Sequence, residues 1–382
     1  MDALTTPSNW QRVRLGDVAE IIGGGTPSTQ VTSFWNGSIN WFTPTEIGIT
    51  KYVYKSQRTI TPLGLKKSSA KLLPIGTILL TSRASIGDCA ILKVVATTNQ
   101  GFQSLIPLEK INNEFLYYLM LTLKNKLLKL ASGSTFLEVS PNKIKNLLIP
   151  LPPLNEQIAI ANILSGLDHY LYSLDALILK KESVKKALSF ELLSQRKRLK
   201  GFNQAWQKVR LGDILSYEQP TKFLVATTQY LQKGFTPILT AGKTFILGYT
   251  NDKHGIYTNI PVIIFDDFTT DSKMVNFPFK VKSSAIKILS LRDNNQADLK
   301  YIYEKLTLLK HQVTDHKRYW IDEFSNIEIL LPPLNEQIAI ANILSALDHE
   351  IISLKNKKRQ FENIKKALNH DLMSAKIRVL KK

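Results

Sequence analysis

The sequence has a single cysteine, no long apolar run and a shortage of acidic residues. Because Cys89 is the only cysteine among 382 residues, internal disulfides are excluded and a reducing compartment is expected. No stretch approaches the roughly 20 consecutive apolar residues that span a membrane. The opening residues MDALTTPSNW have neither the basic nor the apolar region of a signal peptide. These absences predict a cytoplasmic protein without a membrane partner.

The shortage of acidic residues leaves the chain strongly basic. Asp and Glu number 31 against 50 Lys and Arg, a formal net charge of +19 at pH 7. A charge of this sign favours binding to a polyanion, most often nucleic acid. The alternative interpretation is that the lysines only cover solvated faces. The length is typical of two or three domains, each with its own core.

What the sequence does contain is a long internal repeat. The segment LPPLNEQIAIANILSGLDH at Leu151–His169 returns as LPPLNEQIAIANILSALDH at Leu331–His349, 180 residues later. The copies differ only at Gly166 and Ala346. A match of this length excludes chance, so the chain is built from two related halves.

Each copy opens a long amphipathic helix, for which Asn155 and Asn335 are the predicted N-caps. The apolar seams are Leu164, Leu167, Leu171, Leu174 and Ile178, and Leu344, Leu347, Ile351, Leu354, Phe361, Ile364, Leu368 and Leu372. Lys181 and Lys358 are their polar interruptions. A helix from 155 to 199 would be about 65 Å long, and its single apolar stripe requires a partner. We expect the two helices to pair antiparallel; the alternative is that each lies on its own domain.

A second repeat opens each half of the chain, with WQRVRLGDV at Trp10–Val18 and WQKVRLGDI at Trp206–Ile214. Inserts at 19–150 and 215–330 follow these markers and share almost no sequence. An equal framework implies equal docking surfaces, whereas unlike inserts imply two different recognition tasks. The sequence therefore predicts one scaffold that presents two different binding domains.

Both inserts are predicted to be mixed α/β folds. The expected strands are one that ends at Ile22, then Gly76–Thr81, Cys89–Ala96, Ile144–Leu151, Phe235–Leu239, Pro261–Phe265, Phe277–Leu289 and Ile327–Leu331. The expected helices are 113–130 and Asp298–Gln312. The glycine cluster Gly23–Thr26 predicts a turn, because it lacks the Lys-Ser/Thr pair of a phosphate-binding loop.

Several motifs together resemble the specificity subunit of type I restriction–modification enzymes. They are WQxVRLGD before each insert, PLPPLNEQ before each helix, GGTPS (24–28), FWNGSINW (34–41), RASIG (83–87), TTNQGF (97–102), IIFDDF (263–268) and NFPFKVKSSAIKIL (276–289). The resemblance covers essentially the whole chain.

The resemblance implies an α+β fold with a pseudo-twofold internal repeat. Two mixed α/β globular target recognition domains are joined by two long helices that form an antiparallel coiled coil. The expected division is 1–150 for the first recognition domain, 151–202 for the first spacer helix, 203–330 for the second recognition domain and 331–382 for the second spacer helix.

The resemblance also implies a non-catalytic role. Each recognition domain is expected to read one half of a gapped, bipartite target in double-stranded DNA. The helix pair is expected to set the spacing and to dock two methyltransferase subunits, and restriction subunits join the same assembly. S-adenosylmethionine, ATP and magnesium then serve those partners, and no cofactor is expected on this chain.

DNA contacts are expected from polar loop residues near the strand ends. Arg suits guanine, Asn and Gln suit adenine, and Lys and Tyr more often hold phosphate. The candidates are Ser28, Arg83, Ser85, Asn99 and Gln100 in the first insert and Lys243, Lys273, Arg318 and Tyr319 in the second. Each has a structural alternative, since Asn99 and Gln100, for example, can also stabilise a turn.

The competing hypothesis is a stand-alone DNA nuclease or modification enzyme with its catalytic site in an insert. Carboxylates together with a lysine can hold a divalent metal beside a scissile phosphate. The candidates for such a set are Asp266, Asp267 and the triplet Asp271-Ser272-Lys273. His311, Asp315 and His316 suggest a second metal set, although histidines at a helix end are more often solvated.

An amino-methyltransferase is disfavoured by the residues around the proline pairs. Such enzymes need an Asn or Asp before the prolines, and Leu151 and Leu331 occupy those positions. Cys89 enters a predicted strand and is expected to be packed in the core. We therefore expect no catalytic and no metal-binding residue.

Overall fold

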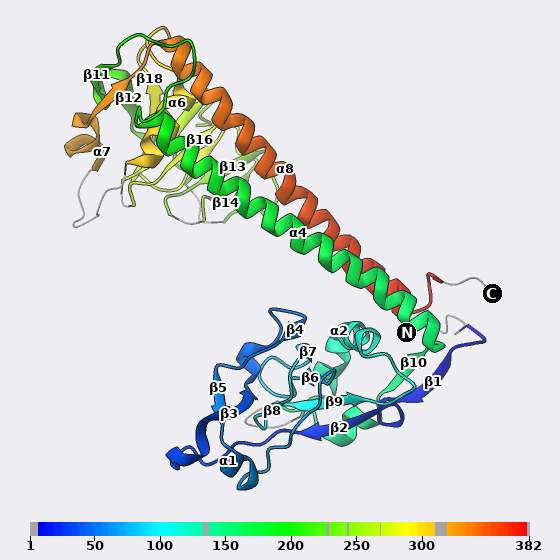
Figure 1. The fold of residues 1–382 in the computed structure, drawn as a ribbon. Coiled ribbons are helices and arrows are strands. Elements are labelled where there is room, and N and C mark those ends of the chain that lie inside the picture. Colours follow the sequence, from blue (N-terminus) through cyan, green and yellow to red (C-terminus); the bar gives the residue numbers. More distant parts are fainter. Residues whose placement is uncertain are drawn as a thin grey trace. The chain divides into compact units, whose positions relative to one another are not determined.

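The structure is a computed structural model that describes residues 7–132, 137–226, 229–242, 244–267, 269–309 and 319–379. The chain divides into two compact units. Unit 1 comprises Met1–Asp175 and Asn356–Lys382, and unit 2 comprises Ala176–Lys355. Each unit holds one insert, a part of each long helix and a hydrophobic core of its own (Figure 1).

Unit 1 contains a two-stranded ribbon (β1-β10), a five-stranded sheet (β2-β9-β6-β7-β4) and a three-stranded sheet (β5-β3-β8). Its elements before the long helix are β1 (Gln11–Arg14), η1 (Leu15–Asp17), β2 (Ala19–Gly23), η2 (Thr32–Phe34), β3 (Trp35–Phe42), η3 (Pro44–Glu46), β4 (Tyr52–Val53), β5 (Arg58–Ile60), α1 (Pro62–Lys66), β6 (Ile78–Leu80), β7 (Cys89–Leu92), β8 (Ala96–Thr98), β9 (Gln103–Pro107), α2 (Asn113–Leu130), α3 (Pro141–Lys145) and β10 (Leu148–Leu151).

Unit 2 repeats this plan with a ribbon (β11-β19), a four-stranded sheet (β12-β18-β15-β16) and a three-stranded sheet (β14-β13-β17). Its elements are β11 (Gln207–Arg210), α5 (Leu211–Ile214), β12 (Leu215–Glu218), η4 (Pro220–Phe223), β13 (Thr236–Leu239), β14 (Ile246–Thr250), β15 (Val262–Asp266), β16 (Ser272–Val275), β17 (Lys280–Val281), β18 (Ile286–Leu291), α6 (Leu299–Leu308), α7 (Tyr319–Asp322), η5 (Phe324–Asn326) and β19 (Glu328–Leu331).

The ribbon closes each insert at the same place. In unit 1 the marker strand β1 pairs antiparallel with β10, with Gln11 opposite Leu151. In unit 2 β11 pairs with β19, with Gln207 opposite Leu331. Because the two ribbons have the same register, each insert enters and leaves the framework through equivalent strands.

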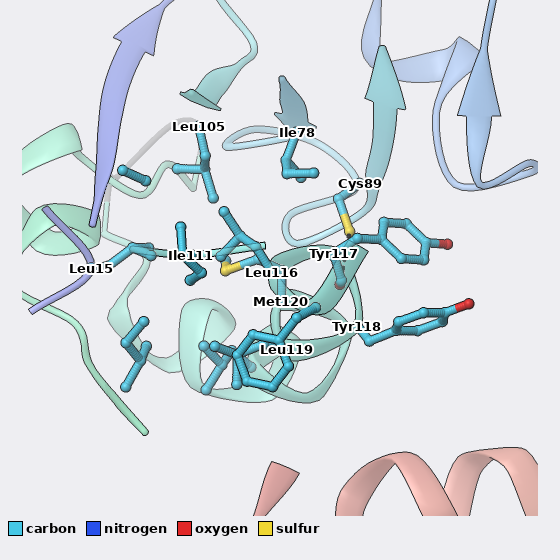
Figure 2. Close-up of a cluster of buried hydrophobic side chains, with 14 of the residues drawn as sticks. Leu15, Ile78, Cys89, Leu105, Ile111, Leu116, Tyr117, Tyr118, Leu119 and Met120 are labelled. Atoms are coloured by element: carbon cyan, nitrogen blue, oxygen red, sulfur yellow. Dashed lines mark hydrogen bonds between the residues drawn. The ribbon is translucent and has the colours of Figure 1, made fainter. Parts of the chain in front are cut away.

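The core of unit 1 lies between α2 and the five-stranded sheet. Asn112 caps α2 by accepting a hydrogen bond from the backbone N–H of Phe115 (2.9 Å), so the predicted helix 113–130 is confirmed. Figure 2 shows Leu116 and Met120 of α2 among the sheet residues Ile78 and Leu105. The hydroxyls of Tyr117 and Tyr118 point away from these aliphatic side chains (Figure 2).

The two long helices have equal lengths. They are α4 (Leu154–Leu193) and α8 (Leu334–Met373). In unit 1, Asp168 of α4 binds Lys365 of α8, and Asp175, further along α4, binds the earlier residue Lys358 (2.7 Å). These contacts advance toward the C-terminus of α4 and toward the N-terminus of α8. The predicted antiparallel pairing is therefore confirmed in this unit (Figure 1).

Unit 2 shows the same antiparallel order. Lys181 of α4 binds Glu350 (2.8 Å), and Lys185, one turn later, binds Asp348 (2.6 Å). The two seam lysines, Lys181 and Lys358, thus interrupt the apolar seams as ion pairs between the helices. The helices therefore pair with each other, as predicted, rather than lying separately on their domains.

Two details of the helix prediction were wrong. Asn155 and Asn335 lie inside the helices, which begin at Leu154 and Leu334, so they are not N-caps. Ile364 is 49 % exposed. The next residue, Lys365, faces α4 instead of Ile364, and its ammonium group pairs with Asp168.

Three predicted strands are each interrupted. In place of one strand at Ile144–Leu151, residues Pro141–Lys145 form α3, with Ser140 as N-cap, and β10 begins at Leu148. The runs Cys89–Ala96 and Phe277–Leu289 each split into two shorter strands. β-Branched and apolar runs fit a strand or a tight turn of helix equally well, so composition alone did not reveal these breaks.

The repeated glutamate locks the framework of unit 1. Glu156 is 2 % exposed and accepts hydrogen bonds from the indole N–H of Trp10 (3.1 Å) and from the guanidinium of Arg378 (2.8 and 3.1 Å). A buried carboxylate is costly unless it is paired, and a two-pronged Arg contact is the strongest pairing available. The lock joins the marker segment before the insert, the start of α4 and the segment after α8.

Unit 2 contains the same lock. Glu336 is fully buried and accepts from Trp206 (3.0 Å) and from both prongs of Arg198 (3.1 and 2.6 Å). The hydrogen bond to Glu336 raises the pKa of Arg198. Arg198 and Arg378 lie 180 residues apart, the same offset as the helix repeat, so the segments after both helices belong to the repeat as well.

The glutamine that follows each glutamate fixes the helix of the insert. Gln157 accepts from the backbone N–H of Asn112 (2.8 Å), the cap of α2, and donates to the carbonyl of Pro152 (2.9 Å). Gln337 accepts from the N–H of Asp298 (2.9 Å), the cap of α6, and donates to Pro332 (2.8 Å). The repeated PPLNEQ segment therefore mounts each insert on its long helix in the same way.

Candidate nucleic-acid interface

Three loops of the first insert meet around two glycines. A Cβ atom on Gly24 would lie 1.8 Å from the carbonyl oxygen of Asn99, and one on Gly25 would lie 2.3 Å from the amide nitrogen of Ala70. The N–H of Gly25 also donates to the carbonyl of Thr98 (2.8 Å). Only glycine permits this approach, so residues 24–28 lie against both the 97–101 loop and the segment after α1.

The candidates Ser28, Asn99 and Gln100 are brought together by this packing. The side chain of Gln100 accepts a hydrogen bond from Thr26, which joins the first two loops. Asn99 accepts from the N–H of Gly101 (2.8 Å), so its oxygen does stabilise a turn. Ser28 and Gln100 are exposed, whereas Asn99 is half-buried.

The candidates Arg83 and Ser85 belong to a neighbouring loop. The N–H of Ser82 donates to the carbonyl of Gly101 (2.8 Å), which places this loop beside the 97–101 loop. Arg83 pairs with Glu138 (2.8 Å), and the carbonyl of Ser85 accepts from Thr81 (2.6 Å). All five candidates of the first insert therefore lie in one loop cluster, although Arg83 already has an anionic partner.

Of the four candidates in the second insert, the structure describes two, Lys273 and Tyr319. Lys273 lies in β16, pairs with Asp271 (3.2 Å) and lies 5.6 Å from the centre of the Phe245 ring. Tyr319 is only 1 % exposed and packs in the core of unit 2, so its assignment as a DNA contact is corrected here. Lys243 and Arg318 lie outside the described residues.

Lysine and arginine side chains outside the motifs extend the loop cluster. No Asp or Glu occurs between Glu46 and Asp88, although that stretch carries seven Lys and Arg residues. Five of them are exposed and have no ion pair with a residue that the structure describes: Lys55, Arg58, Lys66, Lys67 and Lys71. The sequence signal that would have found them is the absence of carboxylates over this stretch.

Two of the three carboxylates of the nuclease hypothesis, Asp266 and Asp267, are held in structural contacts. Asp267 is buried, pairs with Lys287 (2.7 Å) and accepts from the N–H of Trp320 (3.0 Å). Asp266 is also buried and accepts from Gly242 (2.9 Å) and from Thr269 (2.7 Å). Asp266 therefore holds a turn, and Asp267 ties β18 and α7 to the end of β15. The third carboxylate, Asp271, has an exposed side chain that pairs with Lys273 (3.2 Å).

No group of three His, Cys, Asp or Glu residues suited to a metal ion occurs within the described part of the chain. The proposed set His311, Asp315 and His316 lies outside it. Burial raises the pKa of Cys89 to about 12, and Figure 2 shows this thiol in the core, as predicted. In the same described ranges, no helix is long and apolar enough to cross a bilayer.

The chain matches one family over both halves. The model described as "Type I restriction modification DNA specificity domain" matches residues 7–181 and again 203–363. Among curated proteins, the chain is 30 % identical over 372 residues to the type I restriction enzyme MjaIX specificity subunit of Methanocaldococcus jannaschii, which covers 86 % of this chain and 84 % of that protein. It is 45 % identical over 172 residues to the EcoR124I/EcoR124II specificity subunit of Escherichia coli, covering 44 % and 41 %.

Solved structures share the fold. The S subunit of a type I restriction–modification system from M. genitalium superposes with a TM-score of 0.62 at 19 % identity, covering 97 % of both chains. The HsdS subunit of Thermoanaerobacter tengcongensis superposes with a TM-score of 0.52 at 17 % identity, covering 98 % of this chain and 99 % of that one. At these identities the likeness establishes the architecture alone.

Proposed function

The chain belongs to the family of type I restriction modification DNA specificity domains, and on this premise we propose that it is the specificity subunit of such a system. It is a non-catalytic DNA-recognition protein, and each insert reads one half of a gapped, bipartite target in double-stranded DNA. The observation that carries this function is the pair of unlike inserts mounted on identical locks at Glu156 and Glu336. Two different inserts held by the same framework fit two recognition tasks in one protein.

The division of labour follows the repeat. Residues 1–150 and 203–330 are the two recognition domains, and 151–202 and 331–382 are the spacer segments. Support for these bounds comes from the ribbons, which close each insert immediately before its proline pair. In this assignment the helix pair sets the distance between the two half-sites.

Two methyltransferase subunits are the partners of the repeated helix surface. Asn155, Ile158 and Asn162 are exposed on α4, and the identical residues Asn335, Ile338 and Asn342 are exposed on α8. Core packing does not require identity at exposed positions, but docking the same partner twice does. Restriction subunits complete the assembly.

The loop cluster of the first insert is the proposed DNA-contacting surface of unit 1. Its candidates are Ser28, Arg83, Ser85, Asn99 and Gln100, with the exposed lysines 55, 66, 67 and 71 as phosphate contacts. For the second insert the candidates that stay open are Lys243, Lys273 and Arg318. The proposed site of action is the cytoplasm, where DNA and the partner subunits are found.

The experiment that tests the function is a map of methylated DNA motifs in host cells with and without this chain. A specificity subunit gives one asymmetric, gapped motif that disappears when the chain is deleted and returns when it is supplied again. Motifs that persist unchanged after deletion contradict the function. Purified chain that cleaves or methylates DNA by itself, with magnesium or S-adenosylmethionine, supports the enzymatic alternative.

A further inference from the structure

A stacked arginine stands out in the first insert. The guanidinium carbon of Arg58 lies 3.8 Å from the centre of the Trp35 ring and 5.6 Å from that of Trp41. Arg58 is exposed, whereas both tryptophans are buried. The aromatic face therefore holds an otherwise flexible side chain in one position at the surface.

The platform under Arg58 is rigid. Trp35 and Trp41 meet edge to face, with ring centres 5.0 Å apart and an interplanar angle of 87°. The indole N–H of Trp35 donates to the carbonyl of Ser28 (3.0 Å), and that of Trp41 donates to the carbonyl of Gly25 (2.9 Å). The arginine is thereby fixed to the same glycine loop that carries the candidate Ser28.

The charges around Arg58 leave it available to an anionic or acceptor-rich ligand. It lies in the stretch between Glu46 and Asp88 that contains no carboxylate. Glu46 itself accepts hydrogen bonds from the backbone N–H groups of Thr43 and Gln57 (both 2.7 Å). Within the described ranges, the guanidinium of Arg58 has no ion pair and no hydrogen-bond acceptor.

We propose that Arg58 reads a guanine in the half-site recognised by the first insert, with a two-pronged hydrogen bond to its O6 and N7 atoms. A planar fork of donors held in one orientation matches these two acceptors, whereas a lysine at this position has no fork and cannot stack in the same way. The proposal rests on the proposed DNA-recognition function and adds a residue that the motifs did not indicate.

The test is a motif map made in cells where Arg58→Ala or Arg58→Lys replaces the wild-type chain. At one position of one half-site, the preference for guanine falls at least about tenfold in both variants, while the other half-site and the gap stay unchanged. Lys keeps the charge but not the fork, so it does not rescue the preference. Arg196 stacks on Phe190 (4.6 Å) outside the inserts, and Arg196→Ala is the matched control that leaves the motif intact.

Other outcomes overturn the proposal. If Arg58→Ala keeps the full motif and only weakens DNA binding, the arginine acts as a charge on phosphate. If Arg58→Lys alone keeps it, the stacked fork is not what reads the base. If both variants keep the motif and lower only the melting temperature, Arg58 merely covers Trp35. Failure of the proposed function looks different, because the wild-type motif then persists in cells that lack the chain.

Discussion

Units 1 and 2 share the same glutamate lock but differ in how many cations line the carboxylate-free stretch of each insert. In the first insert, a 41-residue stretch between Glu46 and Asp88 has no carboxylate and exposes five unpaired cations among the described residues. In the second insert, the 33 residues between Glu218 and Asp252 also lack a carboxylate, but they carry only three lysines, Lys222, Lys233 and Lys243. The difference teaches that the framework fixes where an insert is held, while the insert determines its own recognition chemistry.

The largest expected effect comes from breaking one of the two glutamate locks, at Glu156 or Glu336. Glu336→Ala leaves the Trp206 N–H and the Arg198 guanidinium without their acceptor, so unit 2 should lose about 2–4 kcal/mol of unfolding free energy. Glu156→Ala should cost unit 1 a similar amount, because its lock has the same partners. Thermal unfolding of both variants measures the two losses.

The matched control for the locks is Glu328→Ala. Glu328 forms an exposed pair with Lys208 (3.7 Å) in the ribbon, so its loss should cost at most about 0.5 kcal/mol. Large and unequal costs at positions 156 and 336 would contradict the equivalence of the two mounts.

A smaller loss of unfolding free energy is expected from the helix pair, and it should differ between unit 1 and unit 2. Tyr170 and Phe361 pack together in unit 1, with ring centres 4.7 Å apart and ring planes tilted by 58°. Unit 2 has Glu350 and Lys181 at the equivalent positions. Phe361→Ala should therefore cost about 1–3 kcal/mol, and Lys181→Ala at most about 1 kcal/mol. In 1 M salt the cost of Lys181→Ala should vanish while that of Phe361→Ala remains. Chemical unfolding at low and high salt makes the comparison.

The smallest effect per residue is expected at the loop cluster. Changing Lys66, Lys67 and Lys71 to Ala should weaken DNA binding by the assembled complex equally for all sequences, because phosphate contacts carry no base information. The slope of log affinity against log salt should fall by up to about 2.7, at about 0.9 per lost contact. The same triple change at Lys180, Lys186 and Lys366 of the long helices is the control. Equal slopes for the two triple variants would remove the lysines from the interface.

Much of this architecture was predictable because it depends on short segments of the sequence. The repeat, the helical periodicity and the proline pairs are properties of short segments, and so the antiparallel helices and the two mixed inserts followed from sequence. The role of Glu156 did not follow, since its partner Arg378 lies 222 residues away and only the folded chain brings them together.

The site was predictable only in part. The motifs indicated the glycine loop and the 97–101 loop, and the structure places these side by side. Burial of Tyr319 was not visible, because an aromatic residue next to basic ones suits a core and a DNA surface equally well. Arg58 was missed since its significance depends on Trp35, a contact that a bulged strand creates across the three-stranded sheet.

The most direct test of the account replaces residues 19–150 with the corresponding insert of a related chain and maps the methylated motif of the hybrid. Because both mounts, at Glu156 and Glu336, are untouched, the assembly should remain active. One half of the recognised sequence should change, while the other half and the gap between them stay the same. A hybrid that folds and methylates DNA but changes both halves, or changes neither, would contradict the separation of framework and inserts.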